Sequence, residues 1–275
     1  MSEAFGFTPR LSVSDAERAE FLAFAEATVV RAGAATLPFF RAGVSVDNKR
    51  EEGFDPVTQA DRAAEQVIRE ALAERYPGHG VLGEEYGYQS GNGLTWVIDP
   101  VDGTRAFLSG MLHWGVLLGL FDGEDAVVGA MYQPYVGELF SGDGTSAWCT
   151  RNGERQPLRS SQRQTLADAI IACTGTEYFR GDDLTRFNLL QENTRMCRLG
   201  TDCYAYAMVA AGAVDFGTDA RLNPYDIEAL IPIIRGAGGV VTTYDGGTPV
   251  LGGTVLASGN ETLHRAALAL FESGG

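Results

Sequence analysis

Two aspartates stand at the end of an apolar run in the stretch WVIDPVDGTRAF, residues 96–107. Pro100 is expected to turn the chain after Ile98, so that Asp99 and Asp102 approach one point. Carboxylates held this close repel each other and lose hydration, which is costly unless a positive charge lies between them. Hard divalent cations prefer such oxygen ligands. The stretch therefore predicts a cation site, and the simpler alternative is an Asp-Pro turn with a capping aspartate.

Gly103 follows this pair and permits a close turn of the backbone. If a helix begins there, its free N–H groups favour a phosphate group. Two metal ions about 3.5–4 Å apart can clamp the attacking and leaving oxygens of a phosphate ester. The sequence contains no P-loop motif. These features together predict that metal ions assist the hydrolysis of a phosphate ester.

Other carboxylates lie next to predicted helices and strands. LGEEYG places Glu84 and Glu85 after a strand, DPVTQAD places Asp55, Thr58 and Asp61 at the head of a helix, and LNPYDIEAL places Asp226 at the head of another. Taken singly, each is better explained as a helix cap or a solvated acid. Taken together, they bring further carboxylates to the ends of elements, where binding sites are commonly built.

The chain resembles the inositol monophosphatase family of Mg²⁺-dependent phosphatases. The matching blocks are DPVTQAD, GEE, WVIDPVDGTRAF and NPYDIEALIPIIRGAGG, in the order that the family has them. Tyr225 is a departure, because many members have tryptophan there. The resemblance implies an α+β fold, a layered αβαβα sandwich of the inositol monophosphatase/fructose-1,6-bisphosphatase type. It also implies a homodimer and two or three Mg²⁺ ions in each active site.

The resemblance also implies which residues would hold the metal ions. Glu84, Asp99 and the carbonyl group of Val101 would bind the first ion. Asp99, Asp102 and Asp226 would bind the second, and Glu84 would also face a third, weaker one. Asp99 would thus be shared between two ions, which would relieve its repulsion with Asp102.

The same resemblance assigns catalytic roles. Asp61 and Thr104 would take a proton from the attacking water, and Glu84 would contribute through the third ion. A hydroxyl group can pass a proton on only if an acceptor such as Asp61 lies within hydrogen-bond reach. The backbone amides of Gly103 and Thr104 would hold the phosphate group.

Three stretches, DGTRAFLSGMLHWGVLLGLF, GTDCYAYAMVAAGAVDF and ARLNPYDIEALIPIIRGAGG, look like the histidinol-phosphate phosphatase branch of the family. Histidinol phosphate carries an ammonium group and an imidazole. Asp202 and Asp219 would lie near this leaving alcohol, and two carboxylates suit a cation better than a neutral polyol. Asn223 would hydrogen-bond the imidazole. The predicted substrate is therefore L-histidinol phosphate.

Alternatives remain open at this point. The enzyme alternative is an inositol-1-phosphate or broad sugar-phosphate phosphatase, and the alternative of another class is a non-catalytic metal or phosphate sensor. Asp202 is also a good N-cap for the helix that follows it. His113 and Trp114 are better explained as packing residues than as ligands.

The composition indicates which binding partners and which cellular compartment to expect. Of the 275 residues, 21 are Lys or Arg and 36 are Asp or Glu, giving a formal charge of −15, and the pI is near 4.6. This balance argues against nucleic acid and anionic membranes as partners, and leaves a small phosphate ester. The four scattered cysteines form no CxxC pair, and the N-terminal residues lack the pattern of a signal peptide. We therefore expect a cytoplasmic protein.

The elements that must position these residues follow from periodicity and capping. Helices are expected at 14–37, 60–78, 182–193, 202–212, 226–239 and 260–273, the first with a capping box of Ser14 and Glu17. Strands are expected at 80–85, 94–99, 114–121, 126–134, 137–142, 168–174, 195–200, 213–218, 240–246 and 254–258. An N-terminal α+β lobe, 1–145, would carry most metal ligands. A C-terminal α/β lobe, 146–275, would complete the site in one compact unit, with a soft boundary over 143–157.

Overall fold

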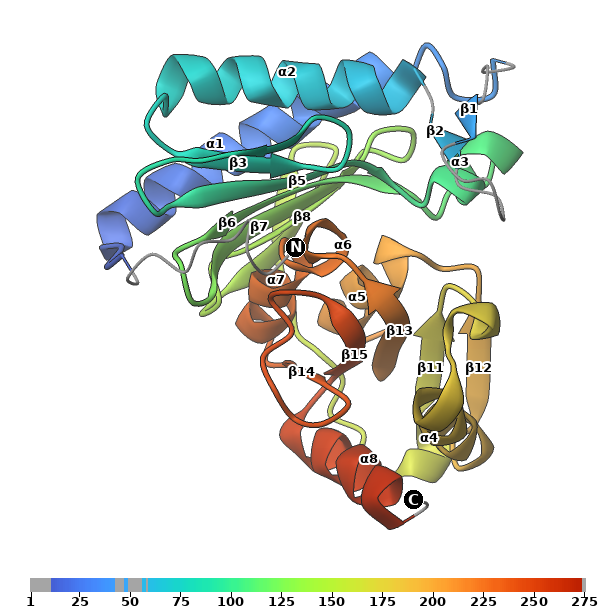
Figure 1. Ribbon diagram of the computed structural model, residues 1–275. Helices are drawn as coiled ribbons and strands as arrows, with labels where there is room; N and C mark the ends of the chain where they lie inside the picture. Colours follow the sequence, from blue (N-terminus) through green and yellow to red (C-terminus); the bar gives the residue numbers. More distant parts are fainter. Residues whose placement is uncertain (1–10, 43–46, 49–55, 58, 274–275) are drawn as a thin grey trace.

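Two β-sheets and the helices between and outside them form five layers in the order α, β, α, β, α (Figure 1). The computed structural model describes residues 11–42, 47–48, 56–57 and 59–273. The predicted layered α+β sandwich is thereby confirmed. Asp55 and Thr58, and the N-terminal residues 1–10, lie outside the described residues.

The helices cover the outer faces of both sheets and fill the space between them. They are α1 Asp15–Thr36, α2 Gln59–Arg75, α3 Thr104–Ser109, α4 Gly181–Glu192, α5 Cys203–Ala210, α6 Pro224–Ile227, α7 Leu230–Gly236 and α8 Glu261–Ser273, with 3-10 turns at Leu166–Asp168 and Thr176–Tyr178. Helices α1 and α2 pack on the outer face of the first sheet, whereas α5 and α7 lie between the sheets. Helices α4 and α8 cover the outer face of the second sheet.

The first sheet has eight strands in the order β10-β9-β8-β7-β6-β5-β3-β4. Its strands are β3 Gly80–Gly83, β4 Gly87–Gln89, β5 Thr95–Asp102, β6 Gly115–Phe121, β7 Ala126–Gln133, β8 Glu138–Gly142, β9 Ala147–Arg151 and β10 Glu154–Pro157. Only β3 and β5 pair in parallel within this sheet. Strands β5, β6 and β7 are buried on both faces because helices cover both.

The second sheet has five strands in the order β12-β11-β13-β15-β14. Its strands are β11 Ile170–Cys173, β12 Met196–Leu199, β13 Phe216–Leu222, β14 Val240–Thr243 and β15 Gly253–Ser258. A separate pair is formed by β1 Asp47–Asn48 and β2 Pro56–Val57. The parallel β11–β13 pair directs the carboxyl ends of these strands toward the first sheet, where the candidate site lies.

The capping box predicted at the first helix is confirmed. The backbone N–H of Glu17 donates to Ser14 Oγ at 3.3 Å, and Glu17 Oε2 accepts from the backbone N–H of Ser14 at 2.9 Å. The helix predicted over 226–239 is instead divided into α6 and α7. Pro232 explains the break, because its ring lacks an N–H group and clashes with the carbonyl four residues earlier, at Glu228.

A hairpin that the sequence analysis did not predict extends the first sheet. Strands β9 and β10 pair antiparallel around Asn152 and Gly153, whose φ angles are 52° and 79°. Both values suit the Asn-Gly turn of a two-residue hairpin. The division at residue 145 stays a prediction, but if the sheets define the lobes, the first lobe continues to Pro157.

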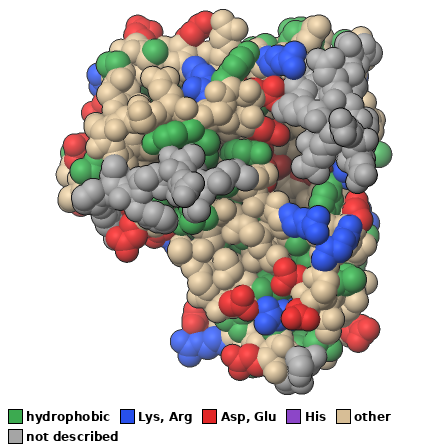
Figure 2. Space-filling model, in the orientation of Figure 1, with side chains coloured by type: hydrophobic (Ala, Val, Ile, Leu, Met, Phe, Trp, Pro, Cys, Tyr) green, Lys and Arg blue, Asp and Glu red, His purple; other side chains and the backbone are tan. Residues whose placement is uncertain are grey.

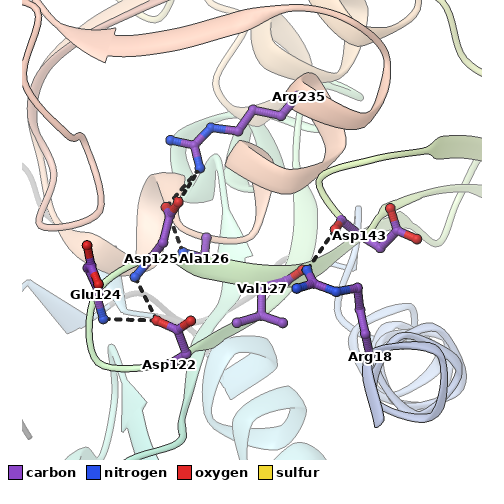
Figure 3. Close-up of polar contacts among 8 residues, drawn as sticks. All are labelled: Arg18, Asp122, Glu124, Asp125, Ala126, Val127, Asp143 and Arg235. Carbon is purple, nitrogen blue, oxygen red and sulfur yellow. Dashed lines mark hydrogen bonds and ion pairs between the residues drawn. The ribbon is translucent and has the colours of Figure 1, made fainter. Parts of the chain in front are cut away.

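Polar contacts at the β6–β7 turn connect the first sheet to helices on both of its faces (Figure 3). Arg235 of α7 pairs with Asp125 at 2.7 Å, and Asp122 Oδ1 accepts from the backbone N–H of Asp125 at 2.9 Å. On the other face, Arg18 of α1 donates to the carbonyl groups of Val127 and Asp143, both at 2.9 Å. These contacts attach α7 to the β6–β7 turn, and α1 to β7 and the β8–β9 turn.

Charged side chains of both signs are interspersed over the face shown in Figure 2. Exposed pairs among the described residues include Arg75 with Glu20 and Arg265 with Glu261, each at 2.6 Å. Such pairs contribute about 0.2–1 kcal/mol each, so packing dominates stability. None of the described helices is both long and apolar enough to cross a membrane.

Candidate active site

A β-bulge in β5 brings the two opening aspartates together. Asp99 pairs with Leu117 of β6 and Asp102 pairs with Gly115, so three steps on β5 oppose two on β6. In a regular strand, residues an odd number apart point to opposite faces, and the extra residue of a bulge removes this alternation. The predicted end of the strand at Asp99 is therefore wrong. The strand continues through Pro100, which is tolerated at a bulge because the ladder is interrupted there.

Gly103 ends this strand and precedes α3. Its φ angle of 86° lies in the left-handed region, and a Cβ atom there would lie 2.5 Å from the carbonyl oxygen of His113. Both constraints favour glycine at this position. The helix predicted to begin after Gly103 is confirmed as the short α3.

Carboxylate oxygens converge in two groups at the ends of β3, β5, α2 and α6. Asp99, Asp102 and Asp226 form one group, and Asp61, Glu84 and Glu85 form the other. Within each group the ligand atoms lie within 4.8 Å of one another. The first group is the set expected to share the second metal ion. The sequence predicts no role for Glu85, and the structure places it in the second group.

The buried carboxylates at this site repel one another, so their ionised forms need a positive charge nearby. Asp99 is only 1% exposed, and its pKa is raised well above the usual range by burial, then by Glu84 and Asp102. The pKa of Asp102 is also raised, first by burial and then by Asp202 and Asp226. Buried carboxylates that disfavour each other's ionisation are a donor set that fits divalent cations. The residues present therefore fit the metal ions that the sequence predicts.

Thr104 and Val101 are connected by a hydrogen bond. The Thr104 hydroxyl donates to the carbonyl oxygen of Val101 at 3.0 Å, and the backbone N–H of Val101 donates to Asp99 Oδ1 at 3.1 Å. Two hydrogen bonds thus connect Thr104 through Val101 to Asp99 of the first carboxylate group. Asp61 is buried at the start of α2, and its pairing with Thr104 stays a prediction.

A cavity of about 210 Å³ opens beside the carboxylate groups. Its walls come from the end of β5, α3, the 3-10 turn after β11, the start of α5, and the segment from β13 to α6. The lining residues are Glu84, Asp102, Gly103, Thr104, Arg105, Thr174, Tyr178, Asp202, Asp219, Ala220, Arg221, Leu222, Asn223, Tyr225 and Asp226. Both halves of the chain therefore contribute to the cavity. All three residues predicted to contact the leaving alcohol are among its walls.

Asp202 does not act as the side-chain cap of α5. It occupies the N-cap position, but its side chain makes no capping hydrogen bond, and its backbone has φ 43° and ψ −141°. This conformation is unfavourable for a residue with a Cβ atom. Burial raises the pKa of Asp202 to about 6, and nearby Arg105 opposes that shift. The alternative that Asp202 merely caps the helix is therefore wrong.

The strained backbone at Asp202 gives a stability prediction. Relief of such strain is worth about 1–3 kcal/mol, whereas the flexibility of glycine in the unfolded chain costs about 0.4–1 kcal/mol. We expect Asp202→Gly to have a free energy of unfolding about 1 kcal/mol higher than Asp202→Ala, measured by urea unfolding without metal. At the exposed Asp182 of α4, the same two substitutions should rank in the opposite order. Equal stabilities at position 202 would refute the strain.

Two other predicted substrate residues have internal partners. Asp219 accepts from the backbone N–H of Thr174 at 2.7 Å and from the Tyr206 hydroxyl at 3.2 Å. Burial raises its pKa to about 7. Asn223 Nδ2 donates to Asp226 Oδ2 at 3.3 Å, and the backbone N–H of Asn223 donates to the same oxygen at 2.6 Å. Asn223 thus orients Asp226, and its contact with an imidazole stays a prediction.

Trp114 is a packing residue, as expected, because it is fully buried against Phe40 and Phe107. His113 is half-buried and lies edge-on to Tyr204, with ring centres 6.1 Å apart. Cavity-lining Arg105 and Tyr178 were not predicted. Tyr178 follows a strand of the second sheet, so its distance in sequence from the acidic motifs conceals it. Arg105 lies directly after Thr104, in the stretch DGTRAFLSG that resembles the histidinol-phosphate phosphatase branch.

An α+β sandwich with two groups of carboxylates beside one cavity is the arrangement of a metal-dependent phosphatase. The chain belongs to the inositol monophosphatase family, whose sequence profile matches residues 17–274. It is 33% identical over 248 residues to the histidinol-phosphatase of Chlorobaculum parvum, covering 89% of this chain and 93% of that protein. It is 36% identical over 221 residues to the inositol-1-monophosphatase of Mesorhizobium japonicum, covering 78% and 82%.

The fold has close relatives among solved structures. An inositol monophosphatase from Zymomonas mobilis superposes with a TM-score of 0.82 at 32% identity. The match covers 94% of this chain and all of that one, 100%. Sequence and structure therefore agree on the family, whereas the relatives carry more than one substrate in their names.

Proposed function

We propose that this phosphatase hydrolyses L-histidinol phosphate to L-histidinol and phosphate with the help of two or three Mg²⁺ ions. The observation that carries the substrate is the pair of carboxyl groups, half-buried Asp202 and buried Asp219, in the wall of the cavity beside the carboxylate groups. Similarity to a histidinol-phosphatase over 89% of the chain supports the same choice.

The carboxylate groups would hold the metal ions. Asp99, Asp102 and Asp226 would share one ion, while Glu84, Asp99 and the carbonyl oxygen of Val101 would bind another. Bound divalent cations would supply the positive charge that a phosphate dianion requires and would acidify the attacking water.

The remaining residues would orient the substrate and move protons. The backbone N–H groups of Gly103 and Thr104 would hold the phosphate oxygens. Thr104 would pass a proton from the attacking water to Asp61, which is buried and held on α2. Asp61 would therefore act as the proton acceptor.

Asp202 and Asp219 would face the leaving alcohol. Burial raises the pKa of both carboxyl groups, to about 6 and about 7. A cationic alcohol would favour their ionised forms and gain charge-assisted hydrogen bonds. A neutral polyol would add no positive charge to that of Arg105, which lies near Asp202. This difference is the physical reason to prefer an alcohol that carries an ammonium group.

The close alternative is an inositol-1-phosphate or broad sugar-phosphate phosphatase, and similarity to the Mesorhizobium japonicum enzyme favours it. A sensor that binds metal and phosphate without hydrolysis is less well supported, because it would need neither Asp61 nor Thr104. The homodimer follows from the resemblance, and the cytoplasmic location from the composition; both stay predictions.

The proposed substrate can be tested by measuring phosphate release from three esters with and without Mg²⁺. The parent is expected to prefer L-histidinol phosphate over inositol 1-phosphate and β-glycerophosphate. Asp202→Ala removes one charge-assisted hydrogen bond, worth roughly 1.5–3 kcal/mol, so kcat/KM for histidinol phosphate should fall about 10–150-fold. The value for the two neutral-alcohol esters should change much less, and the Mg²⁺ dependence should be kept.

A matched control is Asp182→Ala, which removes an exposed aspartate at the start of α4 on the outer layer. It should leave all three esters unchanged. If the parent prefers inositol 1-phosphate, the proposal that histidinol phosphate is the substrate is wrong. An Asp202→Ala variant that loses activity equally on all three esters would show that Asp202 supports the whole site rather than the leaving alcohol.

A further inference from the structure

Glu65 is a buried carboxylate that the mechanism above does not use. It lies on α2 four residues after Asp61, so both side chains project from the same face of the helix. Its exposed fraction is 0%. A buried charge of this kind is costly unless hydrogen bonds and an opposite charge compensate it.

Its oxygens are held by the turn that follows β3. Glu65 Oε2 accepts from the backbone N–H of Glu85 at 2.8 Å, and Glu65 Oε1 accepts from the backbone N–H of Tyr86 at 3.3 Å. Arg69, one turn further along α2, donates to Glu65 Oε1 at 2.7 Å and also to the carbonyl of Gly87. Helix α2 therefore fixes the turn through a carboxylate and a guanidinium group together.

Gly83 shows how closely the turn and the carboxylate are packed. A Cβ atom at Gly83 would lie 1.9 Å from Glu65 Oε1. The last residue of β3 therefore leaves space that the Glu65 carboxylate occupies. The backbone is constrained on both sides of Glu84, by this packing before it and by the Glu85 hydrogen bond after it.

This constraint bears directly on one of the two carboxylate groups. Asp61 comes from α2, whereas Glu84 and Glu85 come from the turn. Their oxygens can converge only if helix and turn keep a fixed relative position. Glu65 is the buried side chain that joins the two, beside the more exposed contacts of Arg69 with Gly87 and of Arg62 with Glu85, and its own oxygens are already occupied by donors.

We propose that Glu65 is a positioning residue that holds the Glu84–Glu85 turn against α2 and thereby sets the affinity of Glu84 for a divalent cation. This inference rests on the proposed function in one respect, namely that Glu84 is a metal ligand. Residues that orient metal ligands typically change metal affinity by about 10–100-fold when they are replaced.

The first test is Glu65→Gln, which keeps the shape of the side chain but replaces one acceptor oxygen with an amide donor. In the metal-free protein, the amide hydrogens of Glu85 and Tyr86 should exchange faster than in the parent. Mn²⁺ binding, followed by the electron paramagnetic resonance of the free ion, should weaken about 10–100-fold at one site. Turnover should recover at high Mg²⁺, because the ligands themselves remain.

A second variant perturbs the same contact from the other side. Gly83→Ala places a methyl group against the carboxylate, whose flexible end can move without unfolding the protein. It should reproduce the weaker Mn²⁺ binding and the faster amide exchange while Glu65 is intact. Because both variants disrupt one contact, the double variant should bind Mn²⁺ little more weakly than either single variant.

Glu26→Gln is the matched control. Glu26 of α1 accepts from the Ser141 hydroxyl at 2.6 Å and pairs with Arg155 at 2.9 Å, at the opposite end of the first sheet. It should lower the melting temperature without changing Mn²⁺ affinity. A merely structural role for Glu65 would give this same result.

The outcomes separate the inference from the function on which it rests. If Glu84→Gln weakens Mn²⁺ binding but Glu65→Gln and Gly83→Ala both bind as the parent does, the positioning role is refuted. If Glu84→Gln also binds as the parent does, Glu84 does not hold a cation, and the proposed metal site fails first. Unchanged amide exchange in Glu65→Gln would likewise overturn the proposed constraint.

Discussion

Asp99→Asn is expected to lose nearly all phosphatase activity and to melt at a higher temperature than the parent in the absence of metal. Asp99 is the carboxylate proposed to be shared by two ions, so its replacement removes charge from both. Its pKa is raised by burial and then by Glu84 and Asp102, so its ionised form destabilises the metal-free fold at neutral pH. An amide of the same shape removes that cost, and its oxygen can still accept from the backbone N–H of Val101.

Turnover and melting temperature should be measured together over a Mg²⁺ titration. Mg²⁺ should stabilise the parent and have little effect on the variant. Asp122→Asn is a matched control, because Asp122 is also a buried aspartate of the first sheet, 3% exposed, but belongs to the β6–β7 turn (Figure 3). It should lose stability and keep its Mg²⁺ dependence. Turnover of Asp99→Asn within a few-fold of the parent would refute the proposed site.

The acidic motifs were readable from the sequence because each lies next to a well-patterned element. Apolar runs fixed the strands before Glu84 and Asp99, and helical spacing fixed the helix that begins near Asp61. The resemblance implied that these carboxylates converge, and the structure shows two groups of them. Periodicity alone does not say which strand ends meet, since that depends on the order of strands in the sheet.

The bulge in β5 shows a limit of strand patterns. From sequence, Pro100 appeared as a breaker that ends the strand at Asp99. The structure instead continues the strand with one extra residue, and this bulge brings Asp99 and Asp102 to the same side. A bulge depends on the partner strand as well as on local residues, so the sequence of β5 alone does not determine it.

Two other differences have local explanations that were available in principle. Asn152-Gly153 is a strong signal for a hairpin, but it lies in a polar stretch that was interpreted as a lobe boundary. Pro232 marks the division between α6 and α7, yet the apolar spacing continues across it. At both positions, the backbone constraint of one residue pair or one proline determines the structure more strongly than composition or periodicity does.

The strained backbone of Asp202 and the buried contacts of Glu65 could not be predicted from the sequence. An aspartate before a helix is normally an N-cap with a relaxed backbone, and only the tertiary structure holds Asp202 away from that conformation. Glu65 occupies an ordinary helical position, and its partners are backbone groups of another element. Backbone partners carry no sequence signature, so residues of this kind emerge only from coordinates.

Thr104→Ala is expected to lower kcat about 10²–10⁴-fold while leaving Mg²⁺-dependent stabilisation close to that of the parent. The hydroxyl is proposed to pass a proton from the attacking water to Asp61. In this structure it donates to the carbonyl oxygen of Val101 at 3.0 Å. One hydroxyl hydrogen can make one strong bond at a time, so the proposed transfer to Asp61 would require this hydroxyl to leave the Val101 carbonyl. Thr104→Ser keeps the hydroxyl and should retain activity within a few-fold.

Asp61→Asn should show a similar loss, because an amide is a poor proton acceptor. If Asp61 and Thr104 act as one unit, the double variant Asp61→Asn/Thr104→Ala should be little slower than either single variant. Single-turnover rates at saturating Mg²⁺ measure this coupling, since they separate the chemical step from product release. Effects that add on a logarithmic scale would show that the two residues act independently. In that case Thr104 would serve only to orient the turn through Val101, and another group would have to accept the proton.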